Sequence, residues 1–448
     1  MISTPIDPRT AWSPFEPGDS QPWTPALAGH LHRRAGFGAS WPELERTLAD
    51  GPQRSIDRLV GPVGDLAAFQ QTYDGYDASA GSALGLSQWW LHRMLHTPHP
   101  LLEKMTLFWQ GYFPANFSRV KSAALMARHV STLREHALGS FREMLKAMAH
   151  DPAMLVSLGA EDNRKAQPNA NFAGELLGRF TVAEGQFSEQ DVREAARAFT
   201  GFRVLRGELR HFSREHDEGE KTVFGRRGRW TSEDVVRITL DQPATARTVV
   251  RKLYRWLISE TSEPDDELLE PLAASFAKDY DLARLTESML RSRLFFSAAA
   301  YRQRVKSPVE YALGIAKALE ATVPTAPLAE DLAALGQSLH EPPTVAGWPG
   351  GPSWLNSFTM LGRGRLAGAM LAKEDRYGGK ADPAAVAQRH GQTSPEAVAG
   401  FFLNVFLQGD LDPAAREHIF RDAGSARGPQ ETVRLAHRIV ALPEFQLA

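Results

Sequence analysis

The feature that most constrains the fold is helical periodicity, which recurs along most of the chain. It is clearest in residues 244–258, ATARTVVRKLYRWLI, where apolar side chains repeat at the spacing of one helical face. These side chains are Ala246, Val249, Val250, Leu253, Trp256 and Leu257. Pro243 stands just before them, where the first turn of a helix tolerates proline. The pattern predicts an amphipathic helix packed on a core.

Other segments share this helical pattern. Residues 188–199 begin with Ser188, and Asp191 follows three residues later, which is a variant of the capping box at a helix start. Residues 101–113 are apolar on nearly every face, so we expect that helix to be buried. Further amphipathic helices are predicted at 281–296, 308–321, 396–407 and 431–442.

Strand signals are sparse, and the best lies at residues 201–225. There FRVLRGELRHFS alternates loosely around Gly207, and KTVFG follows. The predicted fold class is therefore mainly α: a large, bundle-like helical domain with a short β-hairpin inserted near 201–225. We expect an extended N-terminal arm at 1–27 and a single domain, of one lobe or several, at 28–448.

Composition excludes several classes of protein. The chain has 448 residues, a net charge of −2 and no cysteine. This charge is not the strongly basic balance of a nonspecific nucleic-acid binder, so no nucleic-acid partner is expected. The missing thiols exclude disulfides, thiolate catalysis and cysteine-bound metals. No membrane span and no signal peptide are apparent, which predicts a cytoplasmic protein, or an exported one if the start has been trimmed.

Nine motifs, taken in order, resemble the bacterial family called domain of unknown function (DUF) 1800. They are HLHRRAGFGAS, EKMTLFW, NANFAGELLGRFT, DVREAARAFTGF, HDEGEKTVFG, QPATARTVVRKLYRWLI, KSPVEYALG, PPTVAGWPGGPSWLNS and LPEFQL. The resemblance covers about residue 28 to the end of the chain. It implies a helical fold with no settled activity, no known cofactor and, by gene neighbourhood, a sulfatase-like partner protein.

The chain departs from the family pattern at several polar positions. Gln110 and Gly111 follow FW where the family has a histidine-bearing run, and Ala170, Gly174 and Gly178 stand where charged residues are common. The resemblance therefore identifies a divergent member whose activity, if the family has one, is altered or lost.

The first candidate site is the stretch HFSREHDEGEKTVFG at residues 211–225. His216 and Asp217 are adjacent, Lys221 follows, and Gly219 permits a tight bend. A carboxylate beside an imidazole can orient it for acid–base work, and a lysine can hold an anion. The alternative is a turn in which Asp217 caps backbone N–H groups and Lys221 is solvated.

The second candidate pairs Asn171 with Glu175, four residues apart on one helix face. With Asp191 and Glu194 of the next helix they could line a polar cavity, and facing carboxylates can hold a metal. Alternatively, Glu175 pairs with Arg179 in a structural network.

Three other features carry weaker signals. Arg33 and Arg34 precede a Gly-Phe-Gly turn and could bind a carboxylate, either internal or from a ligand. Trp348, in the Pro/Gly-rich loop at 341–354, either fills a core gap or stacks on a sugar or another flat ligand. His92 and His96 have the spacing of a metal pair on a helix but lack a third ligand, so exposed histidines are favoured.

These candidate sites lead to three hypotheses for the function. The favoured one is a binding or scaffold protein that acts with a partner protein or a polymer. The first alternative is a hydrolase-like enzyme whose catalytic residues are Glu175, His216, Asp217 and Lys221, with Asn171 binding the ligand. The second is a metal-dependent protein that uses the same carboxylates and His216.

Overall fold

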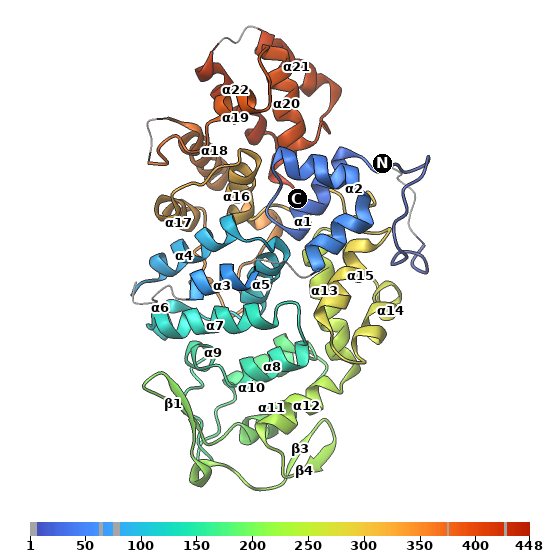
Figure 1. Cartoon of the computed structure of the whole chain (residues 1–448). Coiled ribbons are helices and arrows are strands. Elements are labelled where there is room, and N and C mark those ends of the chain that lie inside the picture. Colours follow the sequence, from blue (N-terminus) through green and yellow to red (C-terminus); the bar gives the residue numbers. More distant parts are fainter. Residues whose placement is uncertain (1–6, 62–65, 75–80, 374–375, 425–427) are drawn as a thin grey trace.

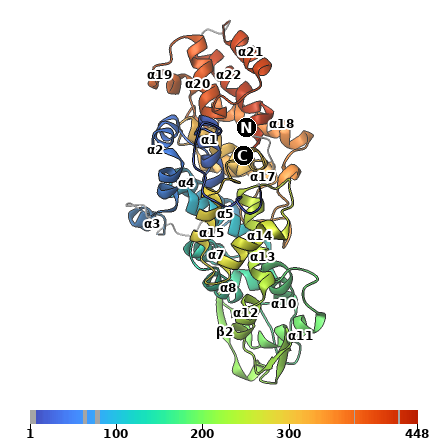
Figure 2. The ribbon, with the colours of Figure 1, turned by 90° about the vertical axis from the view of Figure 1, so that its right-hand side faces the viewer.

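The computed structural model describes residues 7–61, 66–74, 81–373, 376–424 and 428–448. These residues form 22 α-helices and four short strands, which confirms the mainly α prediction (Figure 1). The molecule is elongated, with helices α19–α22 at one end and the strands at the other (Figures 1 and 2).

The first nine helices precede the predicted polar helix at Asn171. They are α1 (Pro25–Ala35), α2 (Trp41–Val60), α3 (Leu66–Asp74), α4 (Ala83–His96), α5 (Pro100–Tyr112), α6 (Phe117–Val120), α7 (Ala123–His136), α8 (Phe141–Ala149) and α9 (Pro152–Ser157). The next six are α10 (Asn171–Glu175), α11 (Glu189–Ala198), α12 (Ser232–Leu240), α13 (Pro243–Leu257), α14 (Asp266–Phe276) and α15 (Leu282–Arg291).

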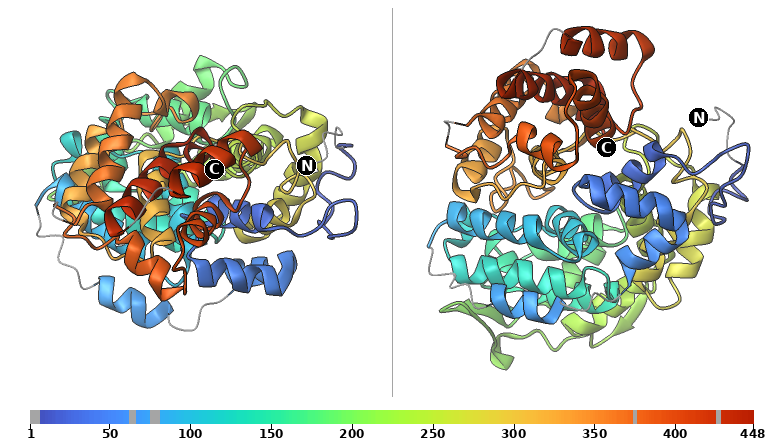
Figure 3. Two further views of the ribbon diagram at one scale, coloured as in Figure 1. Left: turned by 90° about the horizontal axis from the view of Figure 1, so that it is seen from above. Right: turned by 45° about the horizontal axis from the view of Figure 1, so that its top comes forward.

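The last seven helices form the C-terminal part. They are α16 (Pro308–Ala318), α17 (Thr325–Ala334), α18 (Ser357–Leu371), α19 (Pro383–Arg389), α20 (Pro395–Leu407), α21 (Pro413–Gly424) and α22 (Pro429–Ala441). In the right-hand view of Figure 3 the orange and red helices of this part gather above the light-blue and cyan helices that follow α3.

The β-hairpin prediction is confirmed, although the structure has two hairpins. Strand β1 (Phe202–Leu205) pairs antiparallel with β2 (Glu208–His211), and β3 (Lys221–Val223) pairs antiparallel with β4 (Arg226–Gly228). Each turn has two central residues with positive φ, Arg206 with Gly207 and Phe224 with Gly225. Such turns match the twist of the strands that they join. The second hairpin extends to Gly228, beyond the predicted segment.

Helix starts follow the sequence signals. Ser188 accepts a hydrogen bond from the backbone N–H of Asp191, and the Asp191 carboxylate accepts one from the N–H of Ser188, which completes the capping box of α11. Pro243 is the first residue of α13, and the apolar face read from the sequence is buried except at Trp256, which is only partly covered.

Two large cores organise the described residues. The first joins apolar side chains of α1, α2, α5, α7, α8 and the helices from α10 to α15. The second joins those of α4 and the helices from α16 to α22. Helix α5 contributes to both, because Met105 and Trp109 belong to the first core and Leu107 to the second. Trp256 of α13 packs against both cores.

The N-terminal segment lies against the first core. Trp12 donates its indole N–H to the carbonyl of Leu268 at 2.7 Å, and the rings of Phe15 and Trp23 lie 4.8 and 5.5 Å from that of Phe296. Helix α1 begins at Pro25, inside the predicted arm.

Candidate functional site

A cavity of about 440 Å³ lies where the two cores meet. Its walls come from α5, α13, the segment before α16 and the loop between α17 and α18. The volume falls within the range of about 300–1,000 Å³ that is usual for small-ligand sites, which also favour the junction of two structural units. This cavity is therefore the candidate binding site.

The loop that carries Trp348 forms one wall of the cavity. Trp348 and Trp354 both line it, and Trp354 is buried. Gly347 lets the loop close against α5: its φ is +77°, and a Cβ there would lie 2.5 Å from the carbonyl oxygen of Gly111. A side chain at Gly347 would force the loop away from α5.

Three N–H donors on the cavity residues have no acceptor among the described residues. They are Nε1 of Trp256, Nε1 of Trp348 and Nε of Arg304, all buried. An unsatisfied buried donor costs about 1–3 kcal/mol, so such groups usually meet an acceptor from the protein, a water or a ligand. These nitrogens are covered in the unliganded protein, so an oxygen-rich ligand would reach them only after a small shift of the cavity wall.

Arg304 is fixed by its neighbours. Its guanidinium lies 4.2 Å above the ring of Trp256, and its Nη1 donates to Oε1 of Glu310 at 3.2 Å. Its Nε lies 3.7 Å from Oε2 of Glu260, which is an ion-pair distance but too long for a hydrogen bond. The cavity thus has a positive group held rigidly beside an aromatic face.

Lys252 adds a second cation. Its Nζ donates to the carbonyl of Arg179 at 2.7 Å and lies 4.0 Å from the centre of the Tyr112 ring. Burial lowers the pKa of Lys252 to about 8, with the charge of Arg179 acting in the same direction. Lys252 therefore remains mostly protonated at neutral pH. Arg255 also lines the cavity and pairs with Glu263 at 2.8 Å.

A π-helical turn at Leu176–Phe180 supports this wall. Arg179 and Phe180 stand in its last turn, where backbone carbonyl groups have no partner within the helix. The carbonyl of Phe180 accepts the hydroxyl of Tyr112 at 2.8 Å, and that of Arg179 accepts Lys252. Glu175 pairs with Arg179 at 2.7 Å, as the structural alternative proposed. The predicted residue Glu175 thus reaches the cavity wall through Arg179, whose carbonyl accepts Lys252.

The predicted cluster of His216, Asp217 and Lys221 docks against α11. Nε of Arg197 donates to the Asp217 carboxylate at 2.7 Å, and this hydrogen bond lowers the pKa of that carboxyl. Nδ1 of His216 lies 2.9 Å from the carbonyl of Thr200. Lys221 is buried and donates to backbone carbonyls of the bend, and burial lowers its pKa.

The structure does not link this cluster directly to the helix that carries Asn171 and Glu175. Within the described ranges, no hydrogen bond or ion pair joins Glu175 to His216, Asp217 or Lys221. Asn171 donates its amide to the carbonyl of Leu158 at 3.0 Å. A catalytic role for these four residues, and ligand binding by Asn171, stay predictions.

The carboxylates of α11 hold the second hairpin. Glu194 accepts the backbone N–H of Thr222 at 2.9 Å, and Asp191 accepts that of Phe224 at 2.7 Å. These contacts explain why the 211–225 stretch packs on the helix that follows Ser188.

Arg33 and Arg34 are both buried. Arg34 donates to the carbonyls of Ile258 and Ala300 at 3.0 and 2.6 Å, and Arg33 donates to the side-chain oxygen of Gln408. The expected internal salt bridge is therefore replaced by bonds to neutral oxygens. Binding of a ligand by either arginine stays a prediction.

The histidines of α4 have local partners. The rings of His92 and His96 lie 4.4 Å apart, and Nδ1 of His92 lies 2.6 Å from the hydroxyl of Tyr73. In the part of the chain that the structure describes, no group of three or more His, Asp or Glu residues could hold a metal ion.

Sequence reasoning named Trp348, which lines the cavity, but it named none of Lys252, Trp256 and Arg304 as candidate site residues. Trp256 was assigned to the apolar face of its helix, and its unpaired indole N–H has no signature in the sequence. Lys252 and Arg304 come from segments 52 positions apart, so no local pattern joins them.

Fold and site together define a mainly helical protein with an aromatic, cationic cavity between two cores. The chain belongs to the family described as protein of unknown function (DUF1800), whose model matches residues 30–447. This confirms the resemblance read from the motifs. No curated protein and no solved structure matches the chain. No described helix combines the length and apolarity needed to cross a bilayer.

Proposed function

We propose that this protein is a binding protein, and that its cavity takes a segment of an acidic polysaccharide. The observation that carries the proposal is the set of unsatisfied donors at the aromatic wall: the two indole N–H groups and Nε of Arg304. Sugars present flat C–H faces to aromatic rings and many oxygen acceptors to such donors.

The charge of the cavity favours acidic sugars over neutral ones. Lys252, Arg255 and Arg304 line it together with the carboxylate of Glu260, and Arg255 and Arg304 also pair with Glu263 and Glu310 outside the lining. Glu260 already accepts the backbone N–H of Val305 and lies beside Arg304. A carboxylate or sulfate on the sugar would balance the remaining positive charge. The polymer partner predicted from the sequence is therefore proposed to be an acidic polysaccharide.

Isothermal titration calorimetry tests the proposal. The probes are an alginate hexasaccharide with carboxylates, a chondroitin sulfate hexasaccharide with added sulfates, and neutral maltohexaose. We expect binding of an acidic probe and none of maltohexaose. Trp348→Ala should weaken binding about tenfold or more, because it removes both the stacking face and the indole donor.

Two matched variants sharpen this test. Trp348→Phe keeps a stacking face but loses the donor, so its affinity should fall between those of the wild type and Trp348→Ala. Trp230→Ala removes a half-buried tryptophan that follows the second hairpin, outside the cavity, and should leave affinity unchanged. Equal binding of acidic and neutral probes, or of neither acidic probe, would refute the proposal.

Binding should also depend on pH through Lys252. Its lowered pKa of about 8 means that the side chain is charged below this pH and neutral above it. Affinity for the alginate probe, whose carboxylates stay ionised, should therefore fall as the pH rises through about 8. Lys252→Met should bind more weakly at neutral pH and lose the step, and a step of unchanged size in this variant would contradict the role of Lys252.

The alternative to a polysaccharide is a partner protein. The sulfatase-like partner that the family resemblance implies would be one such protein. Phe358 and Leu361 of α18 follow the cavity loop directly, and they are 70% and 59% exposed. Exposed apolar side chains mark an interaction surface when they form one contiguous patch, and Phe358 and Leu361 are three positions apart on the helix. Capture of a protein that Phe358→Ser abolishes, with no binding of the acidic probes, would replace the polysaccharide proposal by this one.

A further inference from the structure

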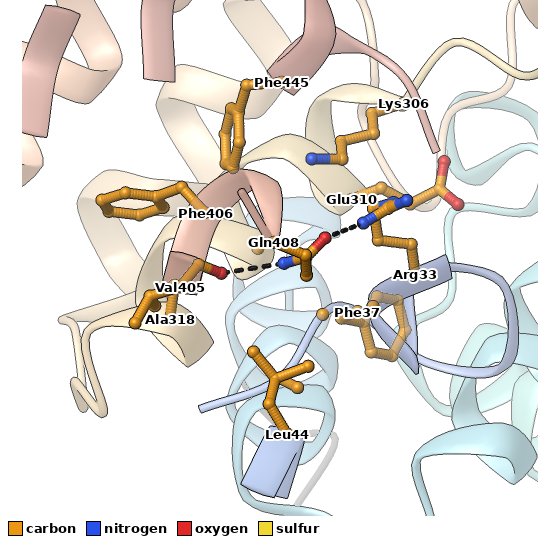
Figure 4. A pocket seen from close by; sticks show the side chains of 14 residues that line it. Arg33, Phe37, Leu44, Lys306, Glu310, Ala318, Val405, Phe406, Gln408 and Phe445 are labelled. Atoms are coloured by element: carbon orange, nitrogen blue, oxygen red, sulfur yellow. Dashed lines mark hydrogen bonds between the residues drawn. The ribbon is translucent and has the colours of Figure 1, made fainter. Parts of the chain in front are cut away.

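A second, much smaller cavity lies where α1, α16 and α20 meet (Figure 4). Its volume is about 20 Å³, and it is lined by Arg33, Lys306, Gln408 and the ring of Phe445 among others. A space of about 10–15 Å³ on this scale holds one water molecule, so this cavity has room for an occupant of roughly that size.

Two cations line this cavity without a full set of acceptors. Nη1 of Arg33 donates to Oε1 of Gln408, but its Nε and Nη2 have no acceptor among the described residues (Figure 4). Lys306 is 5% exposed, and its Nζ lies 3.6 Å from the centre of the Phe445 ring. Within the described ranges this ammonium has no hydrogen-bond acceptor. The side-chain oxygen of Gln408 accepts from Arg33, and its amide donates to the carbonyl of Val405 at 3.0 Å.

The nearby carboxylates are already engaged. Glu310 also lines the cavity, but its carboxylate accepts bonds from Lys104, from Arg304 and from the backbone N–H of Ser307. The carboxylate of Asp410, which acts on Arg33, accepts the hydroxyl of Tyr301 at 2.7 Å and pairs with Arg302 at 3.1 Å.

Positive charge is in excess throughout this part of the interior. Six cationic side chains are buried here: Arg33, Arg34, Lys104, Arg304, Lys306 and Arg363. Lys104 and Arg304 pair with Glu310, Arg304 also lies beside the partly buried Glu260, and Asp410 acts on Arg33. Burial lowers the pKa of Lys306 well below its ordinary value, and the charge of Arg33 acts in the same direction. A buried amine either loses its proton or is paired with a negative group, and an anion beside Lys306 would stabilise its protonated form.

We propose that the cavity between Arg33 and Lys306 binds one small monovalent anion of the size of chloride. The ion would accept hydrogen bonds from the ammonium of Lys306 and from the guanidinium of Arg33. Sulfate and phosphate, with five heavy atoms, exceed the space. The occupant would tie α1 to the segment before α16 and to the end of α20, so it would stabilise the contact between the N-terminal helix and the second core.

Thermal unfolding of the full chain tests this proposal. The melting temperature is measured in sodium chloride, sodium bromide and sodium gluconate at equal ionic strength. An ion that binds only the folded state raises the melting temperature as its concentration increases. We expect both halides to raise it above the gluconate value, because gluconate is too large to enter. Equal melting temperatures in all three salts would overturn the proposal.

Two variants assign the effect to the cavity. Lys306→Met keeps much of the side-chain length but removes the ammonium, and it should abolish the difference between halide and gluconate. Lys146→Met removes an exposed lysine that pairs with Glu143 on α8, and it should keep the difference. A halide effect that survives in Lys306→Met would place the ion elsewhere and contradict the proposal.

A second measurement does not depend on whether the variant folds. Crystals of the unaltered protein are grown in sodium bromide, and anomalous scattering locates the bromide ions. We expect a peak within hydrogen-bonding distance of Nζ of Lys306 and the guanidinium of Arg33. A map with no anomalous peak in the cavity would refute the assignment.

Discussion

Replacing Glu310 by glutamine should lower the free energy of unfolding by about 3–5 kcal/mol, the cost of breaking a buried ion pair by removing one partner. Glu310 is 3% exposed, and its carboxylate faces the buried ammonium of Lys104 and the buried guanidinium of Arg304. Glutamine keeps the shape of the side chain but leaves these two cations without its negative charge. Urea denaturation followed by circular dichroism measures the loss.

The matched control for this variant is Glu417→Gln. Glu417 pairs with Arg421 one helical turn away on α21, and their side chains are 71% and 62% exposed. An exposed pair of this kind contributes about 0.3–0.5 kcal/mol, so the control should be nearly neutral. If both variants lost the same small amount of stability, the cationic interior would not depend on Glu310.

Replacing Trp109 by alanine should also cost about 3–5 kcal/mol of unfolding free energy, as is usual when a large aromatic side chain is removed from a core. Trp109 is fully buried on α5 and packs against Phe113 and Phe141. Its indole N–H donates to the carbonyl of Ala137 at 3.0 Å. Urea denaturation again measures the change.

A second substitution separates the two contributions of Trp109. Trp109→Phe keeps most of the ring but leaves the carbonyl of Ala137 without its donor, which should cost about 1–3 kcal/mol. The loss should therefore be smaller than in Trp109→Ala. A loss below about 1 kcal/mol for the alanine variant would show that the core closes over the gap at little cost.

The sequence predicts the helices well because their signals are local. The stripe on α13, the proline at Pro243 and the pairing of Ser188 with Asp191 each lie within a few residues, and all three appear in the structure. The hairpins were harder to delimit, since their tight turns use Arg206 and Phe224 before glycine rather than the asparagine or aspartate that usually marks such turns.

The candidate site could be predicted only in part. The glycines and tryptophans of the 341–354 loop stand out in the sequence, so Trp348, which lines the cavity, was named as a candidate. The cavity that this loop covers depends on how α5, α13 and the segment before α16 pack together, and no residue spacing encodes that packing. The stretch around His216 and Asp217 also stands out, and in the structure Arg197 holds it against α11.

The sharing of α5 and Trp256 between both cores has a consequence for cooperativity. A protein with two cores can lose them one after the other when each is complete by itself. Here Leu107 and Trp109, two residues apart on one helix, belong to different cores, and Trp256 lies against both. Unfolding of either core would expose apolar side chains of the other core to water. The whole chain should therefore unfold in a single all-or-none transition, despite its length.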